Sequence, residues 1–297
     1  MSAPPPAPVG SAAPPPVSRT RYALAVAATV AAVLSQYVVP SAVPALAGLY
    51  GSLASDLAIV YGIPVVAFAL LVGVDPLRRW AAAMPDATWE GLRWYGGLSA
   101  LGIVVLAVLV AIYSALDPAA LNNLFRPNPV LQEAAGNPAF WIAFSFVIGA
   151  FEETIFRGWI FGYWRGQPGL PWWVHAVWTS ALFAGVHLYY GLTYGVAAPL
   201  FYPLLFLLGF AFAATYHASG GNLVVVAVLH GANDASSFLT LVSPNAALAT
   251  HYGLIGVGAV VALLHGLGWR RFRPPPPVPP PIPPPPPPPP PGGASVL

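Results

Sequence analysis

The stretch PAFWIAFSFVIGAFEETIFRGWIFGYW, Pro138–Trp164, is long and apolar enough to cross a bilayer as a single helix. It nevertheless carries two adjacent carboxylates, Glu152 and Glu153, near its middle. Charged groups at that depth are costly unless they are paired or hydrated, so ionisable residues inside a span indicate a functional site. The stretch therefore predicts membrane-spanning helices and also the place where the chemistry lies.

Composition supports a membrane protein. The chain has 297 residues, of which 57% are hydrophobic and 7% are charged, whereas about a quarter of the residues in soluble domains are charged. The net charge is only +2, and the 11 basic residues are dispersed Arg, which argues against a nucleic-acid partner. The absence of Cys excludes disulfides, a thiolate nucleophile and Cys-bound metals.

Hydropathy predicts an all-α fold, a polytopic bundle of about eight membrane-spanning helices. A Pro-rich disordered tail is expected over residues 1–20, a multipass membrane domain over 21–271 and a disordered polyproline tail over 272–297. The predicted helices lie at about 22–40, 54–74, 96–116, 139–164, 172–191, 197–219, 222–241 and 252–269.

The distribution of Arg predicts the orientation. With the N-terminus in the cytoplasm, nine Arg fall in inward-facing segments and one, Arg126, in an outward-facing segment, which fits the positive-inside rule. Both termini are therefore expected in the cytoplasm. Because the Pro- and Arg-rich, Lys-free composition suggests a high-GC bacterium, we expect the chain in the bacterial inner membrane. The nine inward residues are Arg19, Arg21, Arg78, Arg79, Arg93, Arg165, Arg270, Arg271 and Arg273.

The acids of the first quoted stretch are expected to have different roles. Glu153 and Arg157 are four residues apart and share a helix face, with the acid on the N-terminal side, the favourable order for an ion pair. Glu152 is turned about 100° away. We expect Glu153 and Arg157 to form a structural pair and Glu152 to face a cavity, although bonding of both acids to neighbouring helices is the alternative.

A second intrusion is His187, inside the apolar run Trp172–Gly191. The Gly- and Pro-containing link RGQPGLP, residues 165–171, predicts a tight turn and an antiparallel hairpin. Glu152 and His187 are equally far from this turn, on the order of 20 Å at about 1.5 Å per residue. The two side chains are therefore expected at the same depth, where they can meet.

A third intrusion lies in the run Asn222–Leu241. His230 and Asp234 are four residues apart and share a face, with Asn233 one step round the same side. An isolated His on an apolar helix is more often a packing residue, but three intrusions at one depth are hard to explain that way. Glu152, His187 and His230 are therefore expected to converge.

This set of side chains suits hydrolysis. Glu152 takes a proton from water, His187 orients that water or returns the proton to the leaving amine, and His230 with Asn233 or Asp234 stabilises the oxyanion. The same Glu152, His187 and His230 are also able to hold Zn²⁺ with one open position. Since the local HExxH motif of zincins is absent, the residues leave a zinc and a metal-free mechanism open.

These motifs resemble those of the CPBP family, the CAAX protease and bacteriocin-processing group also called Abi, which is related to the Ras-converting CAAX prenyl endopeptidases. The family motifs EExxxR, FxxxH and HxxxN or HxxxD correspond to Glu152–Arg157, Phe183–His187 and His230–Asp234. The CPBP-like core is about 139–241. The resemblance implies that Glu152 and His187 activate water and that His230 and the following polar residue form the oxyanion pocket.

Two details are left open by the resemblance. The position four residues after His230 is Asp234 where the family often has Asn, and Asn233 stands beside it, so either residue is a candidate for the pocket. Family members are described both as metalloproteases and as metal-free glutamate proteases, and we favour no cofactor over zinc. Phe183 is expected to position His187 by packing.

The predicted function is intramembrane hydrolysis of a peptide or membrane-anchored protein substrate, acting in peptide maturation or bacteriocin self-immunity. The partners are that substrate and the lipid bilayer, with no nucleic acid and no prediction of oligomeric state. Two alternatives remain: a transporter or proton relay that uses the same polar residues, and a non-catalytic scaffold or immunity protein. If these polar residues converge on one water-sized space, the hydrolase is favoured. If they are strung along a path through the bundle, the relay is favoured.

Overall fold

The structure is a computed structural model, and it describes residues 17–50, 53–74, 85–117, 134–165, 170–188 and 195–243, together with residues 132, 191 and 245. In these ranges every regular element is a helix, which confirms the predicted all-α bundle. The predicted helix at 252–269, most of the N-terminal tail and the polyproline tail lie outside these residues.

The N-terminal part contains a helical pair and a long separate helix. Helix α1 (Arg19–Ala42) is followed by the 3₁₀ segment η1 (Pro44–Leu49). It packs against a second rod made of α2 (Leu53–Asp56), the π-helical segment η2 (Leu57–Gly62) and α3 (Ile63–Leu71). We call these elements the α1–α3 pair. Helix α4 (Pro85–Leu116) begins earlier than the predicted residue 96.

The C-terminal part supplies the polar residues singled out in the sequence. Helix α7 (Pro138–Glu153) continues without a break into the π-helical segment η4 (Thr154–Phe161) and α8 (Gly162–Arg165). Helix α9 (Trp172–Val186) follows the predicted turn. The 3₁₀ segment η5 (Gly195–Leu200) leads into α11 (Phe201–Ala218), and α12 (Leu223–Leu239) comes after a turn at two glycines with positive φ, Gly220 and Gly221.

Length and hydropathy make several of these helices suitable for a bilayer. Four described helices are long and apolar enough to cross a membrane, at Arg19–Pro40, Gly91–Leu116, Pro138–Trp164 and Phe201–Ala218. Two shorter apolar helices lie at Leu57–Leu71 and Leu223–Leu239. The chain is therefore an integral membrane protein. Which end faces the cytoplasm remains a prediction, since several of the Arg residues that would decide it lie beyond the described ranges.

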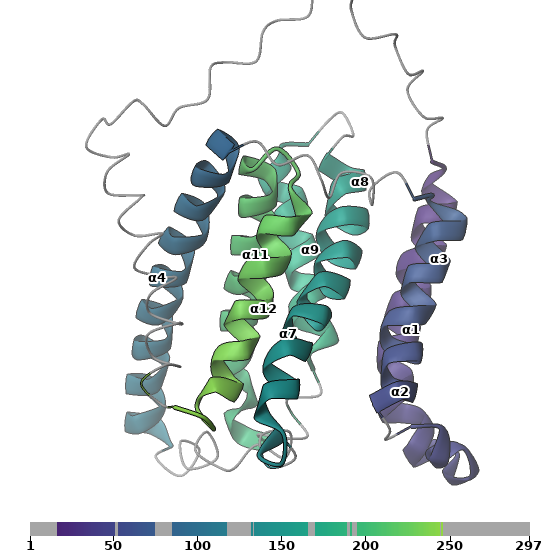
Figure 1. Ribbon diagram of the computed structural model, residues 1–297, viewed down its shortest axis with the longest axis horizontal. Coiled ribbons are helices and arrows are strands. Elements are labelled where there is room, and N and C mark those ends of the chain that lie inside the picture. Colours follow the sequence, from purple (N-terminus) through teal and green to yellow (C-terminus); the bar gives the residue numbers. More distant parts are fainter. Residues whose placement is uncertain are drawn as a thin grey trace, which may run out of the picture.

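The helices are arranged around the α7–α12 contact. In Figure 1, α7 and α12 lie side by side near the centre, α4 stands at one edge and the α1–α3 pair at the other. Helix α11 packs against both α4 and α9. The two acids on α7 and the polar residues on α12 are therefore brought together in the middle of the bundle.

Two glycines allow α7 and α12 to approach closely. A Cβ atom on Gly149 would lie 2.7 Å from the backbone nitrogen of Gly231, and one on Gly231 would lie 2.7 Å from Cα of Phe146. Small residues at helix crossings are common in membranes because they let backbones meet. Gly149 is one turn before Glu153 and Gly231 directly follows His230, so this contact sets the distance between the acid and the imidazole.

The π-helical segment η4 receives the α1–α3 pair. All eight of its residues are buried. Phe68 of α3 stacks on Trp159 with ring centroids 5.3 Å apart, and the indole nitrogen of Trp159 donates to the carbonyl of Gly73 at 2.9 Å. The hydroxyl of Tyr22 in α1 donates to the carbonyl of Ile160 at 3.1 Å. Ring packing and two hydrogen bonds thus attach the pair to the rest of the bundle.

One predicted helix end is wrong. The helix predicted to run to residue 191 ends at Val186, and His187 is its C-cap. The backbone N–H of His187 donates to the carbonyl of Ala184 at 3.1 Å. The ring Nδ1 of His187 donates to the carbonyl of Phe183 at 2.7 Å. The imidazole therefore replaces the main-chain donor that would have continued the α-helix.

Candidate active site

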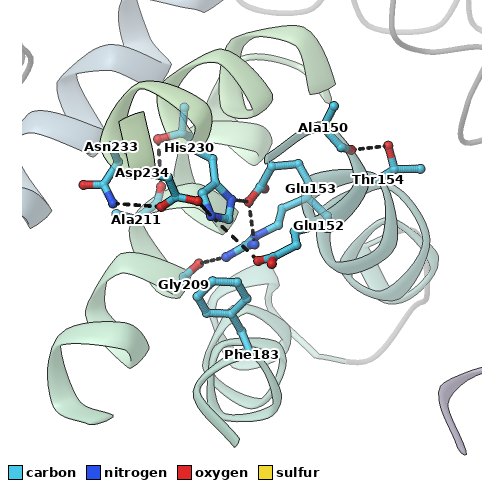
Figure 2. Close-up of polar contacts among 12 residues, drawn as sticks. Ala150, Glu152, Glu153, Thr154, Phe183, Gly209, Ala211, His230, Asn233 and Asp234 are labelled. Carbon is cyan, nitrogen blue, oxygen red and sulfur yellow. Dashed lines mark hydrogen bonds and ion pairs between the residues drawn. The ribbon is translucent and has the colours of Figure 1, made fainter. Parts of the chain in front are cut away.

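Glu153 is the centre of a buried ionic cluster. Its side chain is fully buried, and its Oε1 accepts from Nη1 of Arg157 at 2.7 Å and from Nδ1 of His230 at 2.6 Å. The ion pair with Arg157 is the one predicted from the spacing. Figure 2 shows Glu153 beside His230 of α12. Its other partner, Arg157, lies four residues further along the same continuous helix.

Arg157 is held on several sides. Its Nη2 donates to the carbonyl of Gly209 in α11 at 2.9 Å. Its guanidinium lies over the rings of Phe183 and Phe212, with Cζ 4.6 and 5.2 Å from their centroids. Such cation–π contacts stabilise a desolvated guanidinium. Arg157 therefore links the continuous helix α7–η4–α8, which carries both acids, to α9 and α11.

Glu152 presents its two carboxylate oxygens to different neighbours. Oε1 accepts a hydrogen bond from the hydroxyl of Tyr61 at 3.0 Å. Oε2 is buried and lies 3.7 Å from Nε2 of His230, too far for a direct hydrogen bond. No described group donates to Oε2. A buried carboxylate oxygen without a donor is costly, and separations of this size are often bridged by water.

The contacts of His230 place a proton on one of its ring nitrogens. Since Nδ1 lies 2.6 Å from a Glu153 oxygen that already accepts from Arg157, we assign the proton to Nδ1. Nε2 then faces Oε2 of Glu152 at 3.7 Å and Oδ2 of Asp234 at 3.5 Å. The ring is stacked on Phe212 with centroids 4.8 Å apart. The imidazole is thus fixed in orientation, with one nitrogen directed at two carboxyl groups.

Asp234 and Asn233 are placed differently. Asp234 lies beside Nε2 of His230, as the four-residue spacing predicts. Asn233 approaches Oδ1 of Asp234 with its amide nitrogen at 3.5 Å, and its side chain lines a cavity of about 170 Å³ between α4 and α11. Apolar residues make up most of the cavity wall, including Leu98, Ile103, Leu106, Leu204, Leu207 and Leu208.

His187 lies next to the cluster, at the end of α9. Its Nδ1 donates to the carbonyl of Phe183, so in the neutral ring Nε2 is the basic nitrogen. The ring of Phe183 contacts both imidazoles, with centroids 4.8 Å from His187 and 5.9 Å from His230. Asp234 is within electrostatic range of His187 and of Glu152. Glu152 itself accepts a hydrogen bond from Tyr61 and lies 3.7 Å from Nε2 of His230.

The predicted zinc ligands do not form a ready coordination site. Among the residues that the structure describes, no group of three or more His, Asp or Glu is arranged to hold a metal ion. The choice between zinc and a metal-free mechanism stays a prediction, and we derive no step through a metal.

Both acids bond to neighbouring helices, which is the alternative that the sequence left open, but the sequence did not identify the two partners. The Glu153–His230 bond joins residues 77 apart on different helices, and neither motif indicates it. Tyr61 stands in an apolar run without any spacing that relates it to Glu152. The crossing glycines Gly149 and Gly231 are a weak signal for the first contact, whereas we find no sequence signal for the second.

The comparison with protein families gives an independent finding. Residues 134–236 match the family model described as type II CAAX prenyl endopeptidase Rce1-like. The match covers about a third of the chain and shows that this part is similar to the CAAX protease family; we call residues 134–236 the CAAX protease domain. No curated protein and no solved structure matches the chain.

The CAAX protease domain starts before α7 and ends within α12, so it includes the polar residues of α7, α9 and α12 and leaves out Tyr61. The matched family is one of proteases, and together with the apolar helices the match supports, in general terms, a CAAX-protease-type endopeptidase in the membrane. The role of each residue and the choice between a metal and a glutamate mechanism stay predictions.

Proposed function

We propose that this chain hydrolyses a peptide bond at or within the bilayer by a metal-free mechanism in which Glu152 is the general base. The observation that carries the proposal is the buried Oε2 of Glu152, which has no donor among the described residues and faces Nε2 of His230 at 3.7 Å. A water molecule between these atoms is positioned to lose a proton to the carboxylate as it attacks a carbonyl carbon.

The remaining groups fit the later steps. The attack gives a tetrahedral oxyanion. In the proposed mechanism His230 is an imidazolium from the start, so Nε2 donates to the oxyanion while Nδ1 stays bonded to Glu153. Asp234, 3.5 Å from Nε2, orients the ring, and Asn233 supplies an amide beside it. Protonated Glu152, or His187 at the end of α9, returns the proton to the leaving amine. We assign Glu153 and Arg157 to structural support.

The compactness of the cluster supports hydrolysis over a proton relay. Glu152, Glu153, His230 and Asp234 meet within contacts of 2.6 to 3.7 Å, whereas a relay needs groups spaced along a path. The CAAX protease domain supports the same choice and disfavours a purely non-catalytic scaffold. The substrate class that we propose is a peptide or membrane-anchored protein, processed in peptide maturation or self-immunity.

The test is Glu152→Gln in the full chain, reconstituted in lipid nanodiscs. The probes are two internally quenched CAAX-type peptides, one farnesylated and one not. We expect wild-type cleavage of at least one probe and a loss of at least about a hundredfold in kcat for Glu152→Gln, because a general base contributes roughly 10²- to 10⁴-fold.

The matched control is Asp117→Asn, the same acid-to-amide change at the exposed end of α4, for which we expect unchanged cleavage. Equal activity of Glu152→Gln and wild type would refute the base assignment. A comparison of membrane proteomes from cells with wild type and Glu152→Gln then identifies the uncut precursor. Elemental analysis of active protein that contains stoichiometric zinc would contradict the metal-free mechanism.

A further inference from the structure

Tyr61 makes a direct contact with the proposed base from outside the CAAX protease domain. It lies in the π-helical segment Leu57–Gly62, more than seventy residues before the matched region begins at residue 134. Its hydroxyl donates to Oε1 of Glu152 at 3.0 Å. Its ring packs on Phe151, the residue before Glu152, with centroids 5.6 Å apart and planes inclined by 29°. The phenol is thus anchored beside the carboxylate that it touches.

This contact decides which way the Glu152 carboxylate is turned. The terminal torsion of a Glu side chain is broad, so a carboxylate without a fixed donor samples many orientations. With Oε1 held by Tyr61, Oε2 is left directed at Nε2 of His230. One hydrogen bond therefore divides the carboxylate into a held oxygen and a reactive oxygen.

The backbone around Tyr61 is suited to fixing the hydroxyl. Pro64, near the start of α3, has no N–H to donate to the carbonyl one turn earlier, which favours the wider π-helical turn of residues 57–62. Four residues after Pro64, Phe68 is fully buried against Trp159. The rod that carries Tyr61 is therefore attached to η4, the direct continuation of the helix that carries Glu152.

We propose that Tyr61 is a positioning residue for Glu152, which means that the α1–α3 pair supplies part of the reaction geometry although it lies outside the family domain. This role rests on the proposed function. The proposed role of Tyr61 goes beyond the three family motifs, since the first of them begins at Glu152 and none includes an earlier residue.

The test compares Tyr61→Phe with Tyr163→Phe in the full chain. The first change keeps the ring against Phe151 and removes only the hydroxyl. The second removes a Tyr hydroxyl that donates to the backbone carbonyl of Val17 at 3.1 Å, so it also deletes one hydrogen bond at the α1 side of the molecule without touching Glu152. Both variants are expected to fold like the wild type by thermal unfolding.

Two readouts are measured. On the quenched CAAX-type peptides, Tyr61→Phe is expected to lower kcat roughly tenfold to a hundredfold with KM nearly unchanged, since hydrogen bonds to charged groups have effects of this size. The second readout is labelling of Glu152 by a hydrophobic carbodiimide, quantified by mass spectrometry. Labelling is expected to be several-fold higher in Tyr61→Phe than in the wild type.

The outcomes separate the two proposals. A lower kcat together with higher labelling, and neither change in Tyr163→Phe, supports the positioning role. Unchanged kcat and unchanged labelling in Tyr61→Phe overturn it while leaving the endopeptidase proposal intact. If wild type cleaves no probe and no precursor accumulates in cells, the endopeptidase proposal fails and the positioning role with it, even where labelling still reveals the contact.

Discussion

The α7–α12 contact and the contact between the α1–α3 pair and η4 hold neighbouring helices together by different means. Between α7 and α12, glycines bring the backbones together, so that a Cβ on Gly149 would lie 2.7 Å from the nitrogen of Gly231. Against η4, large rings fill the space, as in the stack of Phe68 on Trp159. At the backbone contact any added side-chain atom forces the helices apart, whereas at the ring-packed contact one ring can be replaced by a smaller one without separating the backbones.

The difference shows where the precise geometry is built. The Glu153–His230 bond at 2.6 Å spans the glycine contact, and the longer Tyr61–Glu152 bond at 3.0 Å extends from the ring-packed pair. We therefore expect changes near the first contact to be costly and changes at the second to be milder.

The largest effect is expected for Arg157→Met. This change leaves Glu153 fully buried without its guanidinium partner, and breaking a buried ion pair from one side lowers the free energy of unfolding by about 3–5 kcal/mol. The measurement is unfolding in detergent followed by tryptophan fluorescence. Arg21→Met makes the same change at an exposed position and is expected to stay within about 0.5 kcal/mol of wild type. Similar losses for both would show that the cluster is not a source of stability.

An intermediate effect is expected for Gly231→Ala. The added Cβ would lie 2.7 Å from Cα of Phe146, so α7 and α12 must separate, at a cost of about 1–3 kcal/mol. Peptide cleavage should fall as well, because the Glu153–His230 distance grows. Gly102→Ala on α4 is the control, since nothing lies within 4 Å of its Cβ and the change favours helix. A fully stable and active Gly231→Ala would contradict the rigid-contact interpretation.

The smallest effect is expected for Trp159→Phe at the ring-packed contact. It removes the hydrogen bond to the carbonyl of Gly73 but keeps an aromatic ring on Phe68, so a loss of about 1 kcal/mol is expected, with cleavage changed little. Thermal unfolding and the peptide assay measure both. Trp173→Phe, at an exposed position, should be neutral. A loss larger than that of Gly231→Ala would reverse the comparison between the two regions.

Local features were predictable from the sequence. The helical rods follow from apolar runs of spanning length, and the Glu153–Arg157 pair follows from helix periodicity. The proximity of His230 and Asp234 has the same origin. Each of these depends on neighbours along a single helix, where spacing fixes which side chains share a face.

Contacts between helices were less accessible. The early end of α9 at Val186 depends on the ring of His187 bonding to the carbonyl of Phe183, which no hydropathy pattern records. The Tyr61–Glu152 bond joins residues 91 apart. The π-helical segments were not predicted either, because hydropathy does not record the extra residue in their turns. The catalytic roles of the site residues stay predictions.

The wide turns of η4 have a consequence for insertions and deletions. A π-helical turn is equivalent to one residue inserted into an α-helix, so the rod changes its angular register as it passes from Glu153 to Trp159. Before this segment, the side chains of Glu152 and Glu153 face α12; within it, the indole of Trp159 faces α3. Deleting a single residue there would restore an ordinary helix and rotate one of these faces away from its neighbour, which makes the length of this segment as constrained as its composition.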